Sequence, residues 1–157
     1  MKISELAYYP GCSLQGTAKD YAESIIGICQ SFGIQLTEVP DWNCCGATAA
    51  HSIDHRASLD LVGRIFRQAT KIPQSEMLVP CPMCFNRLKT VSLAQSSDKK
   101  TEDQYHKPKE EEFPKIWDAA NFFATQKMLE TISNKVQTPL EGLNVVCYYG
   151  CMANRPP

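Results

Sequence analysis

The chain has 157 residues, of which 43% are hydrophobic, 21% charged and 9% aromatic. This balance is typical of one ordinary globular domain with a sizeable core, and it excludes a disordered or fibrous chain. The 16 Lys and Arg residues nearly balance the 17 Asp and Glu residues, so no broad basic surface is available for nucleic acid. No apolar run approaches the roughly 20 residues of a membrane helix, and no secretory signal begins the chain. We therefore expect a cytoplasmic protein.

Strand-like and helix-like patterns alternate through the first part of the chain. Strands are predicted at 6–9, 34–39 and 77–79, and helices at 17–32, 57–69 and 82–91. Strands that alternate with helices in this way are typical of a parallel sheet. The expected fold class is therefore α/β, with a small parallel β-sheet, flanking helices and loops at the C-terminal ends of the strands.

The sequence changes character after residue 95. Residues 96–115 are rich in Lys, Glu, Asp, Ser and Pro, and we interpret them as a charged, mobile linker. Apolar residues at helical spacing then predict an amphipathic helix within 116–142. The β-prone run 144–149 predicts a fourth strand.

The fourth predicted strand ends as the first one does. Tyr-Tyr-Pro-Gly-Cys at 8–12 is echoed by Tyr-Tyr-Gly-Cys at 148–151. We interpret residues 1–95 as a first cysteine-rich repeat and residues 143–157 as the start of a second repeat, which is truncated.

Eight cysteines need an explanation, because a reducing compartment does not favour a disulfide scaffold. Five of them follow the three predicted strands of the first repeat: Cys12, Cys44, Cys45, Cys81 and Cys84. The carboxyl ends of parallel strands share one edge of a sheet, so these thiols are expected to converge. Helix N-termini and backbone N–H groups in the turns would offset the negative charge of a metal–sulfur centre there.

Three kinds of site fit these five thiols. An iron–sulfur cluster can use an odd number of thiolates through bridging sulfide, whereas zinc takes four ligands in a tetrahedron and would leave one thiol spare. A dithiol redox motif at Cys81-Pro82-Met83-Cys84 would leave the other three thiols unexplained. We favour the iron–sulfur cluster and keep zinc as the alternative.

Four further residues are interpreted as structural. Cys29, on the apolar face of a helix, and Cys147, in an apolar strand, are predicted to be buried hydrophobic residues. Asp41 and Trp42 precede the cysteine pair. We expect the Trp42 ring to exclude water from the site and the Asp41 carboxylate to cap the turn.

The cysteine spacing resembles that of a known family. The first repeat resembles the CCG domain in the B-type subunits of heterodisulfide reductases. The resemblance lies in the order Cys12, 31 further residues, Cys44-Cys45-Gly46, the residues from Ala47 to Pro80, and a Cys-x-x-Cys at 81–84. The C-terminal Cys-Tyr-Tyr-Gly-Cys with Arg-Pro-Pro resembles the opening of that family's second CCG repeat.

This resemblance implies an oxidoreductase subunit. The five cysteines of the first repeat would bind one noncubane [4Fe-4S] cluster, and Cys151 would be the first ligand of an incomplete second site. In this family the disulfide of coenzyme M and coenzyme B is cleaved between two such clusters, with electrons from iron–sulfur subunits of the A and C type. Without the missing second repeat, the chain alone is expected to be inactive and to form a dimer through its exposed cluster face.

Two other functions remain open. Related CCG domains occur in quinone-linked succinate or fumarate reductases and in glycolate or lactate oxidoreductases, where partner subunits would bring the chain to the membrane. A structural zinc-binding module is the remaining alternative.

Overall fold

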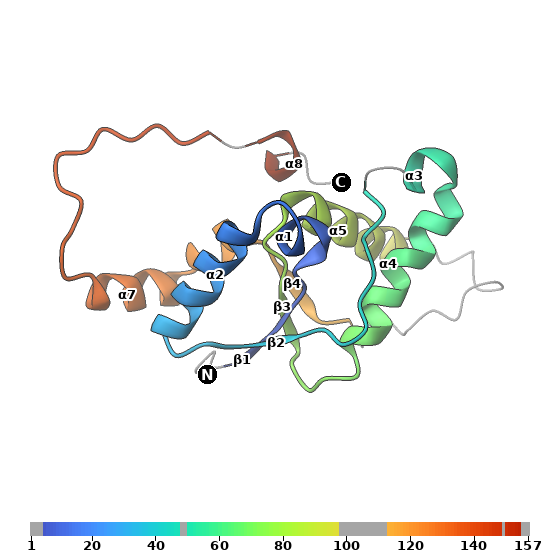
Figure 1. Cartoon of the computed structure of the whole chain (residues 1–157), viewed down its shortest axis with the longest axis horizontal. Helices are drawn as coiled ribbons and strands as arrows, with labels where there is room; N and C mark the ends of the chain where they lie inside the picture. The colour runs from blue at the N-terminus through green and yellow to red at the C-terminus, as the bar shows by residue number, and fades with distance from the viewer. Residues whose placement is uncertain (1–4, 48–49, 98–112, 149, 155–157) are drawn as a thin grey trace.

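A four-stranded parallel sheet forms the centre of the molecule (Figure 1). The computed structural model describes residues 5–47, 50–97, 113–148 and 150–154. The strand order is β2-β1-β3-β4, and the strands are β1 (Glu5–Tyr8), β2 (Gln35–Glu38), β3 (Glu76–Leu78) and β4 (Lys115–Trp117). The predicted α/β class with a parallel sheet is confirmed.

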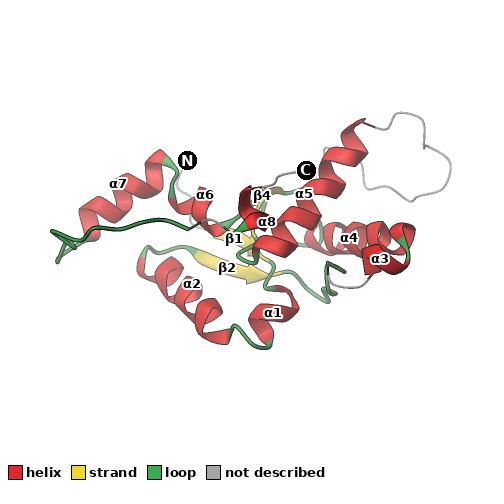
Figure 2. Cartoon of the chain, turned by 90° about the horizontal axis from the view of Figure 1, so that it is seen from above, coloured by secondary structure: helices red, strands yellow, loops and turns green. Residues whose placement is uncertain are grey.

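Helices cover both faces of the sheet, as Figure 2 shows for α2 on one side and α5 on the other. The helices are α1 (Gly11–Gln15), α2 (Lys19–Ser31), α3 (Ala50–Ile53), α4 (His55–Ala69), α5 (Pro82–Ser97), α6 (Ala119–Phe123), α7 (Gln126–Lys135) and α8 (Cys151–Asn154). Among the described residues, none of these helices is long and apolar enough to cross a membrane.

Alternate strand residues divide the core into two halves, because successive side chains of a strand point to opposite faces. Ala7 and Met77 pair in register and face the cluster that includes side chains of α4 and α5. Leu6 and Leu78 face the other cluster, which takes side chains from α2, α6 and α7. Because both faces are covered, the only open boundaries of the described sheet are its edges and the ends of its strands.

The fourth strand lies elsewhere than predicted. Residues 144–148 are not in a strand, and β4 is formed instead by Lys115–Trp117, which pairs with β3. Its β-prone Ile and Trp residues belong to the segment expected to begin an amphipathic helix. Tyr149 and residues 98–112, most of the expected linker, lie outside the described residues.

The single helix predicted within 116–142 is also divided. Asp118 caps α6 by accepting a hydrogen bond from the backbone N–H of Asn121 at 3.0 Å. Thr125 caps α7 in the same way, with its hydroxyl 3.4 Å from the backbone N of Met128. Each cap begins a new helix, and the helical pattern therefore becomes two short helices rather than one.

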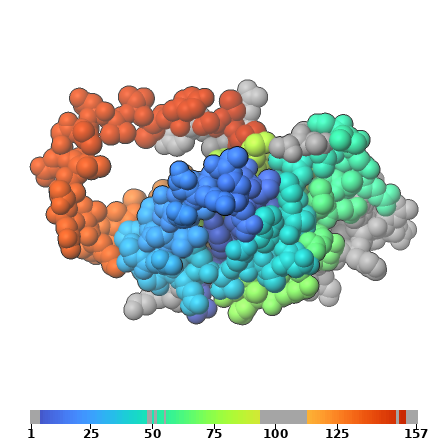
Figure 3. Space-filling model, viewed as in Figure 1, coloured from blue at the N-terminus to red at the C-terminus, as the bar shows by residue number. Residues whose placement is uncertain are grey.

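Residues 136–148 form an extended segment that stands away from the rest of the described chain (Figure 3). Several apolar side chains are exposed along it, including Leu140 at 82% and Val146 at 95%. Cys147 is exposed as well, so its predicted burial is wrong. Residues 144–148, which were expected to form a strand, pair with no strand of the described chain.

We expect Leu88→Ala to lower the free energy of unfolding by about 2–5 kcal/mol, because it removes a fully buried side chain from the core. Leu140→Ala makes the same chemical change at an exposed position and should alter stability by less than about 0.5 kcal/mol. Chemical denaturation followed by circular dichroism measures both values. Equal effects of the two substitutions would contradict this account of the core.

Candidate metal centre

The five predicted cysteines meet at the C-terminal edge of the sheet. Cys12 lies on α1 directly after β1, and Cys44 and Cys45 lie in the loop after β2. Cys81 follows β3, and Cys84 lies in the first turn of α5. Cys45, Cys81 and Cys84 are buried, Cys44 is half-buried and Cys12 is exposed. The site therefore has an inner part and an outer part.

Contacts run from sulfur to sulfur through all five thiols. The Sγ atoms of Cys12 and Cys44 are 3.6 Å apart, and those of Cys45 and Cys84 are 3.2 Å apart. The thiol of Cys45 also interacts electrostatically with that of Cys44, its neighbour in the chain, and the thiol of Cys81 with that of Cys84. The five sulfurs form one connected series, although they come from three different loops.

Backbone N–H groups point at several of these sulfurs. The N–H of Gly46 lies 3.5 Å from Cys44 Sγ, and the N–H of Ala47 donates to Cys45. At the start of α5, the N–H groups of Met83 and Cys84 donate to Cys81. These turns supply the backbone donors that the sequence predicts, and such donors stabilise negative charge on sulfur.

The pKa values of the three inner thiols differ. A hydrogen bond with Cys84 lowers the pKa of Cys81 to about 6 and that of Cys45 to about 7, in spite of their burial. The same two hydrogen bonds raise the pKa of Cys84. Near neutral pH the inner part therefore holds thiolate character at Cys45 and Cys81, which is the form that binds metals.

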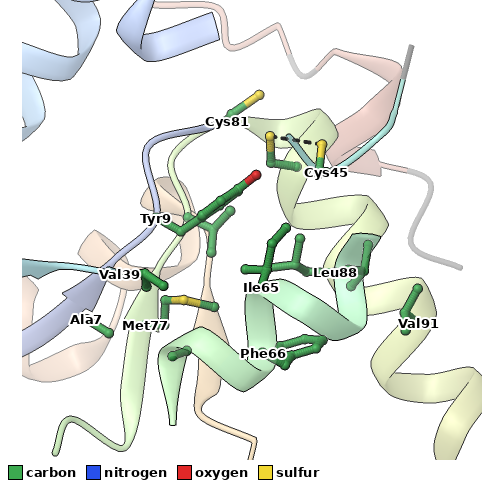
Figure 4. Close-up of a cluster of buried hydrophobic side chains, with 14 of the residues drawn as sticks. Ala7, Tyr9, Val39, Cys45, Ile65, Phe66, Met77, Cys81, Leu88 and Val91 are labelled. Carbon is green, nitrogen blue, oxygen red and sulfur yellow. Dashed lines mark hydrogen bonds between the residues drawn. The ribbon is translucent and has the colours of Figure 1, made fainter. Parts of the chain in front are cut away.

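A tyrosine forms the floor of the site (Figure 4). The Tyr9 side chain is fully buried, and its hydroxyl donates to the backbone oxygen of Asn43 at 2.8 Å. Burial and the nearby thiols raise its pKa, so the hydroxyl keeps its proton and remains a donor. The Trp42 ring packs edge-on against Tyr9, with 5.5 Å between ring centroids. Trp42 also packs against the buried cluster that contains Cys45.

Glu38 connects the first two cysteine loops. Its Oε1 accepts a hydrogen bond from Gln15 Nε2 of α1 at 3.1 Å and from Trp42 Nε1 at 2.7 Å. Glu38 is the last residue of β2, so one carboxylate at the strand end holds both neighbouring segments.

The sequence did not indicate four residues that hold these loops: Tyr9, Glu38, Asn43 and Arg64. Tyr9 and Asn43 each lie within three residues of a cysteine, and that proximity is the only signal that could have identified them. Arg64 lies on α4 and donates to Asp41 and to Asn43, a contact that only the packing of α4 creates. Asp41 therefore acts as an acceptor for Arg64 rather than as a simple cap.

The donor set fits a sulfur-rich metal group. It contains five thiols, backbone N–H donors and no basic side chain in the sulfur series. Within the described ranges, no three or more His, Cys, Asp or Glu side chains are arranged to hold a single metal ion. Cys151, predicted as a ligand of a second site, is exposed and begins α8, which contacts α5.

Two comparisons with known proteins agree with these features. The CCG cysteine-rich domain family matches residues 6–89, a range that includes all five cysteines. A curated relative, the 8-methylmenaquinol:fumarate reductase membrane anchor subunit of Wolinella succinogenes, is 29% identical over 162 residues. The match covers 97% of this chain and 54% of the relative, so the chain spans about half the relative's length.

Gly11→Ala is expected to destabilise the protein more than Gly33→Ala does. Both glycines have positive φ, at 69° and 71°, so alanine costs about 1–2 kcal/mol in backbone strain at either position. A Cβ on Gly11 would also lie 2.8 Å from Cys84 Sγ, whereas one on Gly33 would meet nothing within 4 Å. Denaturation under reducing conditions should show a further loss of about 1–3 kcal/mol for Gly11→Ala. Equal losses would show that Gly11 and Cys84 are not in close contact.

Cys29 and Cys147 should differ sharply in reactivity. Burial raises the pKa of Cys29 to about 11, and its side chain is inaccessible, whereas Cys147 is exposed. Iodoacetamide at pH 8 should alkylate Cys29 at least about 100-fold more slowly than Cys147, because only the thiolate reacts. Mass spectrometry of native and unfolded protein measures the two rates. Similar rates in the native protein would contradict the position of Cys29 in the core.

Proposed function

Because the chain belongs to the CCG cysteine-rich domain family, we propose that it is an iron–sulfur subunit of a multi-subunit oxidoreductase. In this proposal one noncubane [4Fe-4S] cluster is held by the five cysteines of the sulfur series: Cys12, Cys44, Cys45, Cys81 and Cys84. Such a cluster, when bound, supplies transfer of single electrons.

The observation that carries the proposal is the connected series of five sulfurs. A tetrahedral zinc ion would use four thiols, whereas a cluster can use five through bridging sulfide. Cys45 and Cys81 carry the lowered pKa values in this series, and backbone N–H groups already point at Cys44, Cys45 and Cys81. The protein therefore offers thiolate ligands together with donors that balance their charge.

The residues around the site prepare it for this role. The rings of Tyr9 and Trp42 pack on each other beside the cysteine loop and would keep water from that side of a bound cluster. Exclusion of water and hydrogen bonds to sulfur are two of the factors that set the potential of an iron–sulfur centre. Cys12 is exposed and Cys44 is half-buried, so an electron donor or acceptor would approach the cluster from this outer side.

Two substrate classes are compatible with the same centre. The resemblance to heterodisulfide reductase favours cleavage of a disulfide such as that of coenzyme M and coenzyme B. The relative from Wolinella succinogenes, a fumarate reductase subunit, favours instead a quinone-linked reductase of the succinate or fumarate type. We prefer the quinone-linked function, because it is supported by a match along nearly the whole chain.

Partner subunits follow from this function. We propose that further iron–sulfur subunits exchange electrons with the chain and that the assembly lies at a membrane. Residues 143–157 would begin a second CCG repeat, with Cys151 as its first ligand. The exposed apolar side chains of Val145, Val146 and Tyr148 support this, because a strand of a second sheet would cover them.

Anoxic reconstitution with iron and sulfide should give a brown, oxygen-sensitive centre that contains about four iron atoms and four acid-labile sulfides per chain. Cys44→Ser and Cys45→Ser should each reduce the iron content severely, because each removes one ligand of the series. Iron and sulfide assays with electron paramagnetic resonance spectra measure the outcome.

Cys29→Ser and Cys147→Ser are matched controls, because neither thiol belongs to the sulfur series. Both should leave the iron content almost unchanged. Tight zinc without sulfide would favour the structural zinc module, and full iron content in a Cys44→Ser, Cys45→Ser double variant would refute the proposed ligand set.

A further inference from the structure

Asn43, the residue directly before Cys44 and Cys45, forms hydrogen bonds through its backbone oxygen and through both polar atoms of its side chain. Its backbone oxygen accepts from the Tyr9 hydroxyl at 2.8 Å, and its side-chain oxygen accepts from Arg64 Nη1 at 2.9 Å. Its side-chain nitrogen donates to the backbone oxygens of Cys44 at 2.9 Å and Leu61 at 3.0 Å. Asn43 therefore connects the end of β1, helix α4 and the backbone of the first paired cysteine.

Arg64 also holds the turn that leads to Asn43. Its Nη1 donates to the backbone oxygen of Asp41 at 2.7 Å, and its Nη2 forms an ion pair with the Asp41 carboxylate. Gln68, one turn further along α4, donates to the same carboxylate at 3.3 Å. Asp41 has a φ of 46°, in the left-handed region that a residue with a side chain seldom adopts. Arg64 thus contacts the one non-glycine residue of the described chain that has a positive φ.

Cys44 and Cys45 are neighbours in a loop, and their side chains point in different directions. Contacts from outside the loop are needed to keep these two directions fixed. Cys44 contacts Cys12 in the outer part of the site, whereas Cys45 contacts Cys84 in the inner part. A small rotation of the backbone at Asn43 would move both sulfurs and break both contacts. The direction of the pair thus depends on the residues that fix Asn43.

We propose that Arg64 is a positioning residue for the cysteine pair, acting through Asn43 and Asp41 rather than by touching a sulfur. The guanidinium suits this role because its fork of N–H donors reaches two residues at once, which a lysine amine cannot do in the same geometry. The importance of the pair as metal ligands rests on the proposed function. The orientation of Cys44 and Cys45 that Arg64 sets is a property of the protein without metal.

In this proposal Arg64 contributes more to the orientation of the Cys44 and Cys45 side chains than to the overall stability of the fold. The side chains of Arg64 and Asp41 are 36% and 74% exposed, and ion pairs so exposed stabilise a fold only slightly. Loss of Arg64 should therefore leave the sheet and its core in place while the cysteine loop gains freedom. This difference separates a positioning role from a purely structural one.

Disulfide pairing in the metal-free chain reports the direction of Cys44. The full chain with Cys29→Ser and Cys45→Ser leaves Cys44 as the sole thiol of its tryptic peptide, residues 20–56. Brief treatment with diamide oxidises two thiols to a disulfide, and the two electrons and two protons reduce the diazene to a hydrazine. Mass spectrometry then distinguishes Cys44 joined to Cys12 from Cys44 joined to the peptide that holds Cys81 and Cys84.

In this parent chain we expect pairing with Cys12 to dominate, because the two Sγ atoms are 3.6 Å apart. Arg64→Met removes all three contacts of the guanidinium. Loss of the one to Asn43, a hydrogen bond of ordinary net strength, should lower the ratio of that pairing to the alternative about fivefold. Arg67→Met makes the same change one turn along α4, where no contact with the described residues 41–47 is lost, and should leave the ratio unchanged. Arg64→Lys should fall between the two.

The thermal midpoint, measured on the same samples, shows whether each variant is folded. An unchanged ratio in folded Arg64→Met would overturn the proposal. If Arg64→Met does not fold, Arg64→Lys decides, and a ratio equal to that of the parent would again overturn it. The disulfide test uses no iron, so it is independent of the cluster reconstitution. A lowered disulfide ratio with a failed reconstitution would refute the proposed function alone. An unchanged disulfide ratio with a successful reconstitution would refute the positioning role alone.

Discussion

The common direction of β1, β2 and β3 is the constraint on which the whole site depends. Parallel strands bring all their carboxyl ends to one edge, so three loops far apart in the sequence begin within reach of one another. β1 lies between β2 and β3 and keeps the loop of Cys12 between the other two loops. Any rearrangement of this strand order would separate the five sulfurs.

Much of this arrangement could be predicted, because local sequence signals and topology agree over residues 6–91. The strands show apolar runs, the helices show a 3.6-residue period, and the cysteines lie where strands end. Residues 116–149 were harder. Their apolar pattern did not reveal the helix caps at Asp118 and Thr125, and the pairing of β4 with β3 is a tertiary contact that no local pattern encodes.

The cysteines were predicted, but the contacts that hold them were not. Cysteine spacing is a strong signal because few other roles place thiols after successive strands. Arg64 carries no such signal, since an arginine on an exposed helix face is usually only solvated. Its role depends on how α4 packs beside the loop after β2, and this is decided by buried side chains such as Ile65 and Phe66.

The carboxylate of Glu38 joins two segments beside the outer part of the site. Through Gln15 and Trp42 it links α1, which carries Cys12, to the segment that precedes the cysteine pair. Because both hydrogen bonds end on the same carboxylate oxygen, loss of the Glu38 side chain would release α1 and the Trp42 segment at once.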